Sequence, residues 1–378
     1  MSYALTTIWY ERQRFLPAIL AVAFSAVLMA LQSGIVLGLL TMMSLPVDHA
    51  AADLWVGFPG VRSVDLGRPV PERWWVSVAG QPEIVQVEPI ILGFSLWTRP
   101  GPSPSTTISE VCTVVGTRLH PQGLAVVRAL REAPELLSRL SEPGTVVIDR
   151  AELTRLGVQN VGQTADVYGV RVRVVGLVDG CKSLGGPYVF CSLETARQLL
   201  RYSAGEATYL VARVTAPHQA SRVAQRLQTH YRMTALTADE FSLRSRWHWL
   251  VTTKAGIAVG FTALLGLLVG AVVTSQTLYA ATAASKREYS TLRAMGIPKW
   301  RLQAGVLAQS FWVGCFGLLL AAPVAWLLAE GAVRLGTAVR WHPWIIAATI
   351  VVTLVMALGA GLAALRSFQG VDPAHNIR

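Results

Sequence analysis

Charged side chains are scarce in this chain of 378 residues. They make up 15% of it, whereas soluble domains carry about a quarter. The sequence also lacks the Gly-x-x-x-x-Gly-Lys-Ser/Thr loop that cradles nucleotide phosphates, a His-Glu-x-x-His or Cys/His zinc cluster, and the Gly-x-Ser-x-Gly turn of serine hydrolases. These absences argue against a chain that binds ATP through a P-loop, a zinc enzyme or a serine hydrolase, and we expect no catalytic, cofactor or metal site.

Four long apolar runs dominate what is present, at residues 16–45, 250–284, 302–329 and 344–365. About 20 apolar residues cross a hydrocarbon core of ~30 Å, so each run predicts a membrane-spanning helix. The first run is far longer than the roughly 7–15 apolar residues of a signal peptide, which argues against a cleaved leader. The stretch between the first two runs is long enough for a domain with its own core.

The predicted fold class is therefore an α-helical membrane protein with four transmembrane helices and a mixed α/β extracytoplasmic domain inserted between helices 1 and 2. In chain order we expect an interfacial helix, helix 1, the α/β domain, helix 2, a cytoplasmic loop, helix 3, a short external loop, helix 4 and a cytoplasmic tail. Their bounds are 1–15, 16–45, 46–245, 246–284, 285–301, 302–330, 331–343, 344–365 and 366–378. A frayed tail is the alternative for the first segment.

Lys and Arg in the short segments give the orientation, because these residues are retained on the cytoplasmic side. The loop between the second and third runs is the richest, and both ends of the chain also carry arginine. These residues are Lys286, Arg287, Arg293, Lys299 and Arg301 in the loop, with Arg12, Arg14, Arg366 and Arg378 at the ends. We therefore expect both termini and this loop inside the cell and the α/β domain outside.

The net charge of +11 does not indicate nucleic-acid binding. The positive residues are spread along the chain, and no basic-aromatic motif of a nucleic-acid-binding module is present. Cytoplasmic loops that follow the positive-inside rule, together with a basic external domain, account for the charge. The expected medium is the lipid bilayer.

Alternating apolar runs and turn residues predict a mixed α/β structure for the external domain. We expect strands at 74–78, 111–115, 145–148, 170–178, 188–191 and 209–214, and helices at 123–140, 150–156, 193–200 and 219–231.

Cys181 and Cys191 bracket a turn-rich segment between two of these strands. A disulfide across this hairpin is one interpretation, since disulfides persist outside the cell. Free thiols are the other, because Cys112 makes three external cysteines and leaves one unpaired.

Glycines spaced four apart occur in the first two apolar runs. Small residues at this spacing let helices approach closely in lipid, although glycine is also common in any apolar helix. The candidate packing residues are Gly34, Gly38, Gly256, Gly260, Gly266 and Gly270.

The cytoplasmic loop reads KREYSTLRAMG from residue 286 to residue 296. It is short, charged and compatible with a helix. Gly296 suits a left-handed helix end, and Pro298 prevents the helix from continuing. An ordinary positive-inside hairpin is the alternative to a rigid docking helix.

This loop resembles the cytoplasmic signature R-x-E-I-G-x-L-R-A-L-G of the FtsX/MacB family of ABC-transporter permeases. The closing VDPAHNIR is similar to the family's D-P-x-x-x-L-R ending, and residues 144–149, 161–163 and 174–177 resemble its external strands and turn. The order of one span, a large external domain and three spans is also that of the family. Tyr289, Ser290 and Gln163 depart from the usual Ile, Gly and Asp.

The long first span with its glutamine and the Trp-rich start resemble the DevC-like branch, which has no fused ATPase domain. The resemblance implies a permease subunit of an ATP-driven exporter of the mechanotransmission type, in the bacterial inner membrane. The implied partners are a separate ABC ATPase that binds ATP and Mg²⁺, a second copy of the chain, a membrane-fusion adaptor and an outer-membrane channel. The implied ATPase-coupling residues are Lys286, Arg287, Glu288, Leu292, Arg293, Ala294, Met295 and Gly296.

Two other functions stay open from the sequence. One is a non-transport regulator of cell-wall hydrolases of the FtsX type, for which a hydrolase partner would be diagnostic. The other is a membrane-anchored enzyme, for which the sequence offers no candidate catalytic residues.

Overall fold

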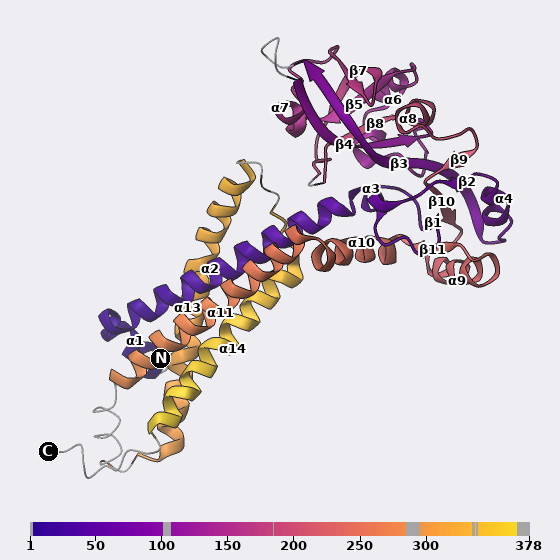
Figure 1. The fold of residues 1–378 in the computed structure, drawn as a ribbon. Helices are drawn as coiled ribbons and strands as arrows, with labels where there is room; N and C mark the ends of the chain where they lie inside the picture. The colour runs from indigo at the N-terminus through magenta and orange to yellow at the C-terminus, as the bar shows by residue number, and fades with distance from the viewer. Residues whose placement is uncertain are drawn as a thin grey trace. The chain divides into compact units, whose positions relative to one another are not determined.

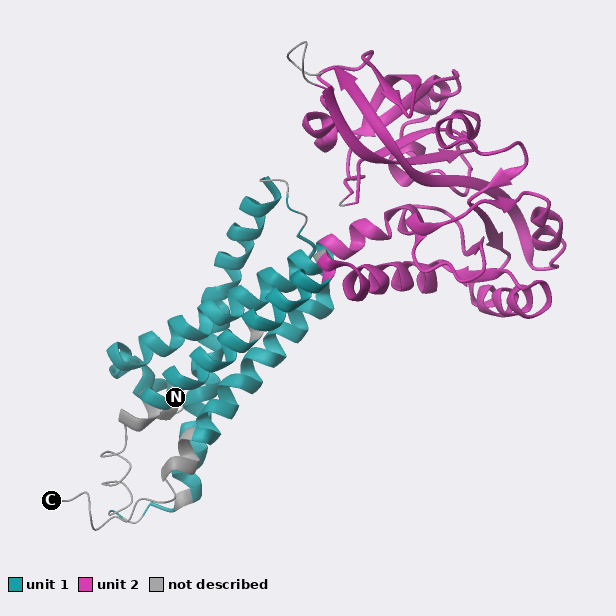
Figure 2. Ribbon diagram, viewed as in Figure 1, with its two compact units in different colours: residues 1–38, 257–378 teal, residues 39–256 magenta. Residues whose placement is uncertain are grey.

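The computed structural model describes residues 3–100, 107–183, 185–284, 295, 297–334, 337 and 339–368. The chain separates into two compact units, which are coloured differently in Figure 2. One consists of residues 1–38 and 257–378 and is called the membrane unit. The other consists of residues 39–256 and is called the external domain. Each has its own hydrophobic clusters.

Long apolar helices build the membrane unit (Figure 1). They are α2 (Arg12–Met43), α11 (Lys254–Ala284), α13 (Lys299–Arg334) and α14 (Pro343–Phe368), of which α2 and α11 run on into the external domain. Each contains a stretch long and apolar enough to cross a membrane: Arg12–Met43, Gly256–Thr277, Trp300–Arg334 and Pro343–Ala363. The predicted four transmembrane helices are thus confirmed.

A short helix, α1 (Tyr3–Tyr10), precedes α2 where the sequence predicts an interfacial helix. Its Trp9 and Tyr10 are exposed, whereas Ile8 is buried in a cluster with Phe15 and Val313. One side of α1 therefore packs on α2 and α13, and the aromatic side chains of Trp9 and Tyr10 are exposed on the other side.

The external domain is organised around a nine-stranded sheet in the order β11-β1-β10-β3-β4-β8-β5-β7-β6. Its strands are β1 (Leu54–Gly57), β3 (Ile84–Pro100), β4 (Thr107–Thr117), β5 (Thr145–Asp149), β6 (Thr164–Val167), β7 (Val170–Val178), β8 (Tyr188–Ser192), β10 (Tyr209–Val214) and β11 (Thr234–Thr237). A small separate sheet pairs β2 (Val70–Pro71) with β9 (Glu206–Ala207). With the helices around it, this confirms the predicted mixed α/β domain.

Strand β3 is shared by two lobes. Its first half pairs with β10 and its second half with β4, and near its end it also pairs with β6. The antiparallel strands β11, β1, β10 and the first half of β3 form the inner lobe, onto which α4 (Trp74–Ala79) and α9 (Ala220–Tyr231) pack. The second half of β3 closes a ring with β4, β8, β5, β7 and β6, which is the outer lobe.

Side chains on the two faces of the outer-lobe strands enter different cores. In β8, Tyr188 and Phe190 belong to the cluster that also contains Trp55 and Phe241. The alternate residues Val189 and Cys191 belong to a second cluster. This alternation is the period of two expected of a strand that is buried on both faces.

The hairpin interpretation of Cys181 and Cys191 is wrong. Strand β5 lies between β7 and β8 in the sheet. Cys181 is buried in the first cluster and Cys191 in the second, so the two side chains lie in different cores. Both are free thiols, as is Cys112.

Several predicted elements change type or split. Residues 74–78, expected as a strand, form helix α4, in which Trp75 and Val76 are exposed while Val78 is buried. The helix expected at 123–140 is divided into α5 (Arg128–Arg131) and α6 (Pro134–Leu140), because Pro134 starts a new helix. The predicted α8 (Leu193–Leu200) is found with the same bounds.

Candidate functional site at the base of the external domain

Most of the predicted ATPase-coupling loop lies outside the described residues. This holds for Lys286, Arg287, Glu288, Leu292, Arg293, Ala294 and Gly296; Met295 is an exposed turn residue. The coupling role of the loop stays a prediction. The described candidate is instead the base of the external domain, where the chain leaves α2 and returns toward α11.

Helices α3 (Leu45–Asp48) and α10 (Ala238–Thr252) form this base. Helix α10 begins with a capping box: the Thr237 hydroxyl accepts the Glu240 backbone N–H at 3.3 Å, and the Glu240 carboxylate accepts the Thr237 N–H at 3.0 Å. Phe241 follows at once and packs against Trp55 and Tyr209, with ring centroids 5.7 and 5.4 Å apart. The start of α10 is therefore anchored in the core of the domain.

Four polar side chains join α3 to α10, and we call this group the base clamp. The Asp48 carboxylate accepts hydrogen bonds from Ser44 at 2.7 Å, Ser242 at 2.6 Å and Arg246 at 2.6 Å. The Arg246 Nε also donates to the Ser44 hydroxyl at 2.8 Å. Charge-assisted hydrogen bonds of this kind are short and strong. The clamp therefore ties the segment after the first span to the segment before the second.

A second set of contacts fixes the far side of α10 to the short 3-10 helix η1 (Val64–Leu66). The Ser245 hydroxyl accepts the Val64 backbone N–H at 3.0 Å, and Ser245 is fully buried. The Trp249 indole N–H donates to the Asp65 carboxylate at 3.2 Å. Helix α10 is thus held on two sides within the external domain.

The helical path breaks where α10 ends. The sequence predicts one helix over 246–284, but α10 ends at Thr252 and Thr253 has extended backbone angles. The Thr253 hydroxyl donates to the Trp249 carbonyl at 2.6 Å and accepts the Gly256 N–H at 3.0 Å. A Cβ at Gly256 would lie 2.0 Å from the Trp249 carbonyl oxygen, so the turn requires glycine there. This predicted packing glycine thus faces a contact within its own turn.

Other predicted packing glycines lie against neighbouring elements of the membrane unit. A Cβ on Gly266 would meet the Gln32 side chain at 2.0 Å, and one on Gly270 would meet Ser25 at 3.2 Å. The Gly34 carbonyl accepts the Arg340 N–H at 3.1 Å. Gly38 is buried and Gly260 half-buried; their packing role, and any role of these glycines between two copies, stays a prediction.

A polar contact between α2 and α11 accompanies these glycines. The Thr274 hydroxyl donates to the Ser25 hydroxyl at 3.1 Å. The Ser25 hydroxyl in turn donates to the Gly270 carbonyl, also at 3.1 Å. Both side chains are fully buried. In lipid, such hydrogen bonds and close backbone approach hold helices together.

Close-packed glycines in α13 and α14 were missed by the sequence reasoning. A Cβ on Gly317 would lie 2.5 Å from Val22, and one on Gly361 would lie 2.3 Å from the Ser310 hydroxyl. Neither belongs to a pair spaced by four, so that spacing could not find them.

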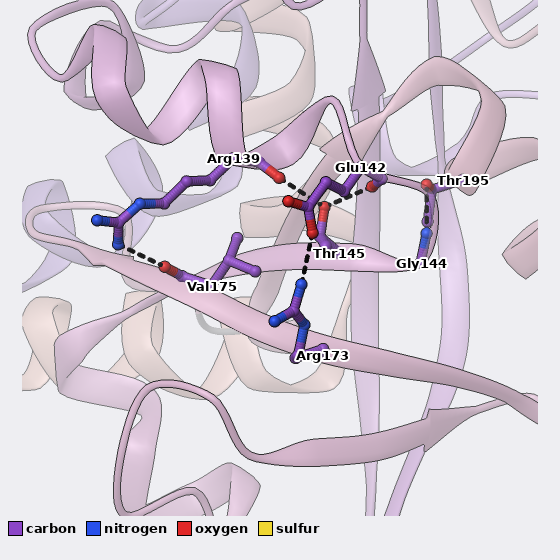
Figure 3. A network of polar contacts seen from close by, with 7 residues as sticks. All are labelled: Arg139, Glu142, Gly144, Thr145, Arg173, Val175 and Thr195. Carbon is purple, nitrogen blue, oxygen red and sulfur yellow. Dashed lines mark hydrogen bonds and ion pairs between the residues drawn. The ribbon is translucent and has the colours of Figure 1, made fainter.

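A polar network fixes the start of β5 in the outer lobe (Figure 3). The Thr145 hydroxyl lies 2.7 Å from the Glu142 carbonyl, and the Glu142 carboxylate pairs with Arg173. The Gly144 N–H donates to the Thr195 hydroxyl at 3.3 Å, and Gly144 has a φ of +70°. The segment at residues 144–149, which resembles a strand of the family, is thus held by hydrogen bonds and one ion pair. These contacts stabilise the fold of the outer lobe.

Two buried carboxylates lie at the end of that strand and in the helical turn that follows it. Asp149 and Glu152 are 1% and 2% exposed. Burial raises the pKa of both, although each accepts backbone N–H groups that oppose the shift. Among the described residues, no group of three or more His, Cys, Asp or Glu side chains is placed to hold a metal ion. The expectation that the chain binds no cofactor stays a prediction.

The chain is similar to two solved structures over about half of its length. No curated protein matches the sequence. Among solved structures, the periplasmic region of MacB from Actinobacillus actinomycetemcomitans is 11% identical, with a TM-score of 0.34, and the match covers 51% of this chain and 92% of that one. The extracellular domain of the noncanonic ABC-type transporter YknZ from Gram-positive bacteria is also 11% identical, with a TM-score of 0.33, over 49% of this chain and 98% of that one.

Two family profiles match directly. The profile described as the FtsX-like permease C-terminal matches residues 260–373, and the one described as the MacB-like periplasmic core domain matches residues 15–230. Together they cover most of the spans and of the external domain, and the second alone covers more than half of the chain. The chain therefore belongs to the family of FtsX- and MacB-like permeases.

Proposed function

We propose that the chain is the permease subunit of an ATP-driven exporter in the bacterial inner membrane. A separate ABC ATPase supplies hydrolysis of ATP with Mg²⁺, and a second copy of the chain completes the membrane part. A membrane-fusion adaptor and an outer-membrane channel continue the path outside. Family membership supports this proposal, because permeases of this family work with an ABC ATPase.

The base clamp is the observation that carries the mechanism. Asp48 follows the first span and Arg246 precedes the second, and they are joined at 2.6 Å. The side chains of both are mostly buried, at 22% and 27% exposed. Displacement of the two spans would therefore enter the external domain through this hydrogen-bonded joint, and no passage for cargo through the helices is needed.

The ATPase is proposed to dock on the cytoplasmic loop at 286–296. Its charged residues, including Glu288 and Arg293, suit an interface with a soluble partner. A hydrogen-bonded charge at such an interface costs about 2–5 kcal/mol when its partner is lost.

Variants of the two sites separate recruitment from transmission. In the full chain purified in lipid nanodiscs with its ATPase, Glu288→Lys should abolish co-purification of the ATPase. Asp48→Asn and Arg246→Gln should keep the ATPase bound. A non-hydrolysable ATP analogue should change the rate of amide hydrogen exchange in β1 and β11 of the wild type. Each of the two variants should make this change about tenfold smaller, since hydrogen bonds to charged groups contribute about 1.5–3 kcal/mol.

A double-mutant cycle and a matched control complete the experiment. The Asp48→Asn/Arg246→Gln double variant should be no worse than either single variant, because the two residues act as one joint. Arg128→Gln removes an exposed pair with Glu132 in the same domain and should change nothing. A wild-type chain that recruits no ATPase would contradict the proposal, and one that recovers a cell-wall hydrolase in its place would favour the regulatory alternative.

A further inference from the structure

The loop between β7 and β8 is anchored to the outer lobe by its first residues. The Cys181 N–H donates to the Asp149 carboxylate, and the Ser183 N–H donates to the Glu152 carboxylate at 3.4 Å. Both acceptors are buried acids at the end of β5 and in the helical turn that follows it. Buried carboxylates that accept backbone N–H groups hold a loop in one conformation, because neither partner can turn to water.

Tyr188, the first residue of β8 and the one that follows this loop, reaches the base of the domain. The Tyr188 phenol donates to the Met42 carbonyl at 3.3 Å. Met42 lies in the final turn of α2, where backbone carbonyls have no partner within the helix. A Cβ on Gly185 would lie 3.8 Å from the Trp249 ring of α10. Tyr188 therefore contacts the end of α2, and Gly185 of the loop lies beside the Trp249 ring near the end of α10.

Tyr188 joins these two sets of contacts. It is 4% exposed and lies in the same core as Leu45 of α3 and Phe241 of α10. Burial raises the pKa of the Tyr188 phenol, and the neighbouring Ser183 side chain opposes that shift. Tyr188 thus links the Met42 carbonyl to β8 and, through its pairing with Thr113, to β4, while the Ser183 N–H links the preceding loop to Glu152.

We propose that Tyr188, together with the described residues 179–183 and 185–187 that precede it, is a positioning element that carries displacement of the end of α2 into the outer lobe. This inference rests on the proposed function, in which α2 moves when the ATPase binds nucleotide. The base clamp transmits that movement to α10 and the inner lobe. The Tyr188 contact gives the outer lobe a second connection to α2.

Conservative substitutions test this role in the same nanodisc complex. Tyr188→Phe keeps the buried ring and removes only the hydroxyl. In this variant, the change in amide hydrogen exchange that the ATP analogue causes in β5 and β8 should be about fivefold smaller. Fivefold is the equilibrium effect of one neutral hydrogen bond. The exchange change in α10 should be retained. Ser183→Ala, which leaves the tyrosine in place, should give a smaller loss at the same strands.

Tyr202→Phe is the matched control. The Tyr202 hydroxyl lies 3.1 Å from the Thr208 hydroxyl in the same domain, so the substitution removes a phenol hydrogen bond away from α2. It should leave both exchange changes as in the wild type. If the role of Tyr188 were purely structural, Tyr188→Phe would raise amide hydrogen exchange even without nucleotide. It would then reduce the nucleotide-induced changes in the outer lobe and in α10 by the same factor.

The outcomes separate the two proposals. If α10 responds to the analogue and the outer lobe of Tyr188→Phe responds as in the wild type, the inference is overturned and the proposed function stands. If α10 of the wild-type chain does not respond, the proposed function fails, and the inference fails with it.

Discussion

The membrane unit and the external domain bury different kinds of side chain in their cores. In the described part of the chain, the largest fully buried side chains all lie in the external domain, among them Trp55, Trp97 and Tyr209. Among the described residues of the membrane unit, the buried polar side chains are all neutral: Ser25, Thr274, Gln309, Ser310 and Thr353. The described residues of the external domain, in contrast, include the buried acids Glu88, Asp149 and Glu152.

This difference follows from the two surroundings. Water drives large apolar side chains together at roughly 25 cal/mol per Å² of apolar surface buried. Lipid provides no such drive between helices, so close approach at small residues takes its place. The external domain should therefore be most sensitive to loss of volume, and the membrane unit to gain of volume.

Trp97→Ala should give the largest effect. Trp97 is fully buried where β3 pairs with both β4 and β6, and its indole N–H donates to the Leu156 carbonyl at 3.1 Å. Loss of a buried Trp side chain typically costs about 3–5 kcal/mol. Hydrogen exchange of β4 and β7 in the full chain in detergent would measure the cost. Trp75→Ala is the control, because Trp75 is 44% exposed. If both variants lost the same stability, the expected sensitivity of the external domain to loss of buried volume would be contradicted.

Gly317→Ala should give a smaller effect of the opposite kind, since it adds volume. The new Cβ would lie 2.5 Å from the branched Val22 side chain, which has little room to turn. Overpacking of this kind costs about 1–3 kcal/mol. Gly331→Ala on the same helix meets nothing within 4 Å and should be neutral or slightly stabilising. Unfolding in sodium dodecyl sulfate, followed by circular dichroism, would compare the two variants.

Glu152→Gln should give the smallest effect and confine it to the external domain. Burial raises the pKa of Glu152 above its ordinary value of 4.5, so the folded state holds the proton more tightly than the unfolded state. As the pH falls from neutral toward 4.5, the wild type should therefore gain stability relative to Glu152→Gln, and the difference should level off below that value. Hydrogen exchange of β5 between pH 7 and pH 4 would measure it. A difference that shrinks as the pH falls would contradict the assigned direction.

Regular patterns made part of the fold predictable from the sequence. The spans were found because about 20 apolar residues have few other uses. Strand β7 and helix α8 were placed with the same bounds because their alternation and turn residues agree. Helix α4 was mistaken for a strand because Trp and Val favour strands locally, whereas packing on β3 decided the outcome.

The base clamp could not have been found in the same way. Asp48 and Arg246 are distant in the sequence, and each is an ordinary charged residue beside a span. Tyr188 lies in an apolar strand, and nothing around it indicates a bond to Met42. The coupling loop was assigned through a family resemblance, whereas these contacts depend on the order of strands in the sheet, which the residues alone did not reveal.

That strand order also has a consequence for synthesis. Strand β1 lies between β10 and β11, which belong to the chain from residue 209 onward. As the domain emerges on the far side of the membrane, Leu54–Gly57 has both edges open until almost the whole domain has followed. An unpaired apolar strand is prone to aggregation during such a delay. The last strands to arrive therefore protect the first one. A nascent chain stalled before Tyr209 should be a substrate for the chaperones and proteases on that side of the membrane.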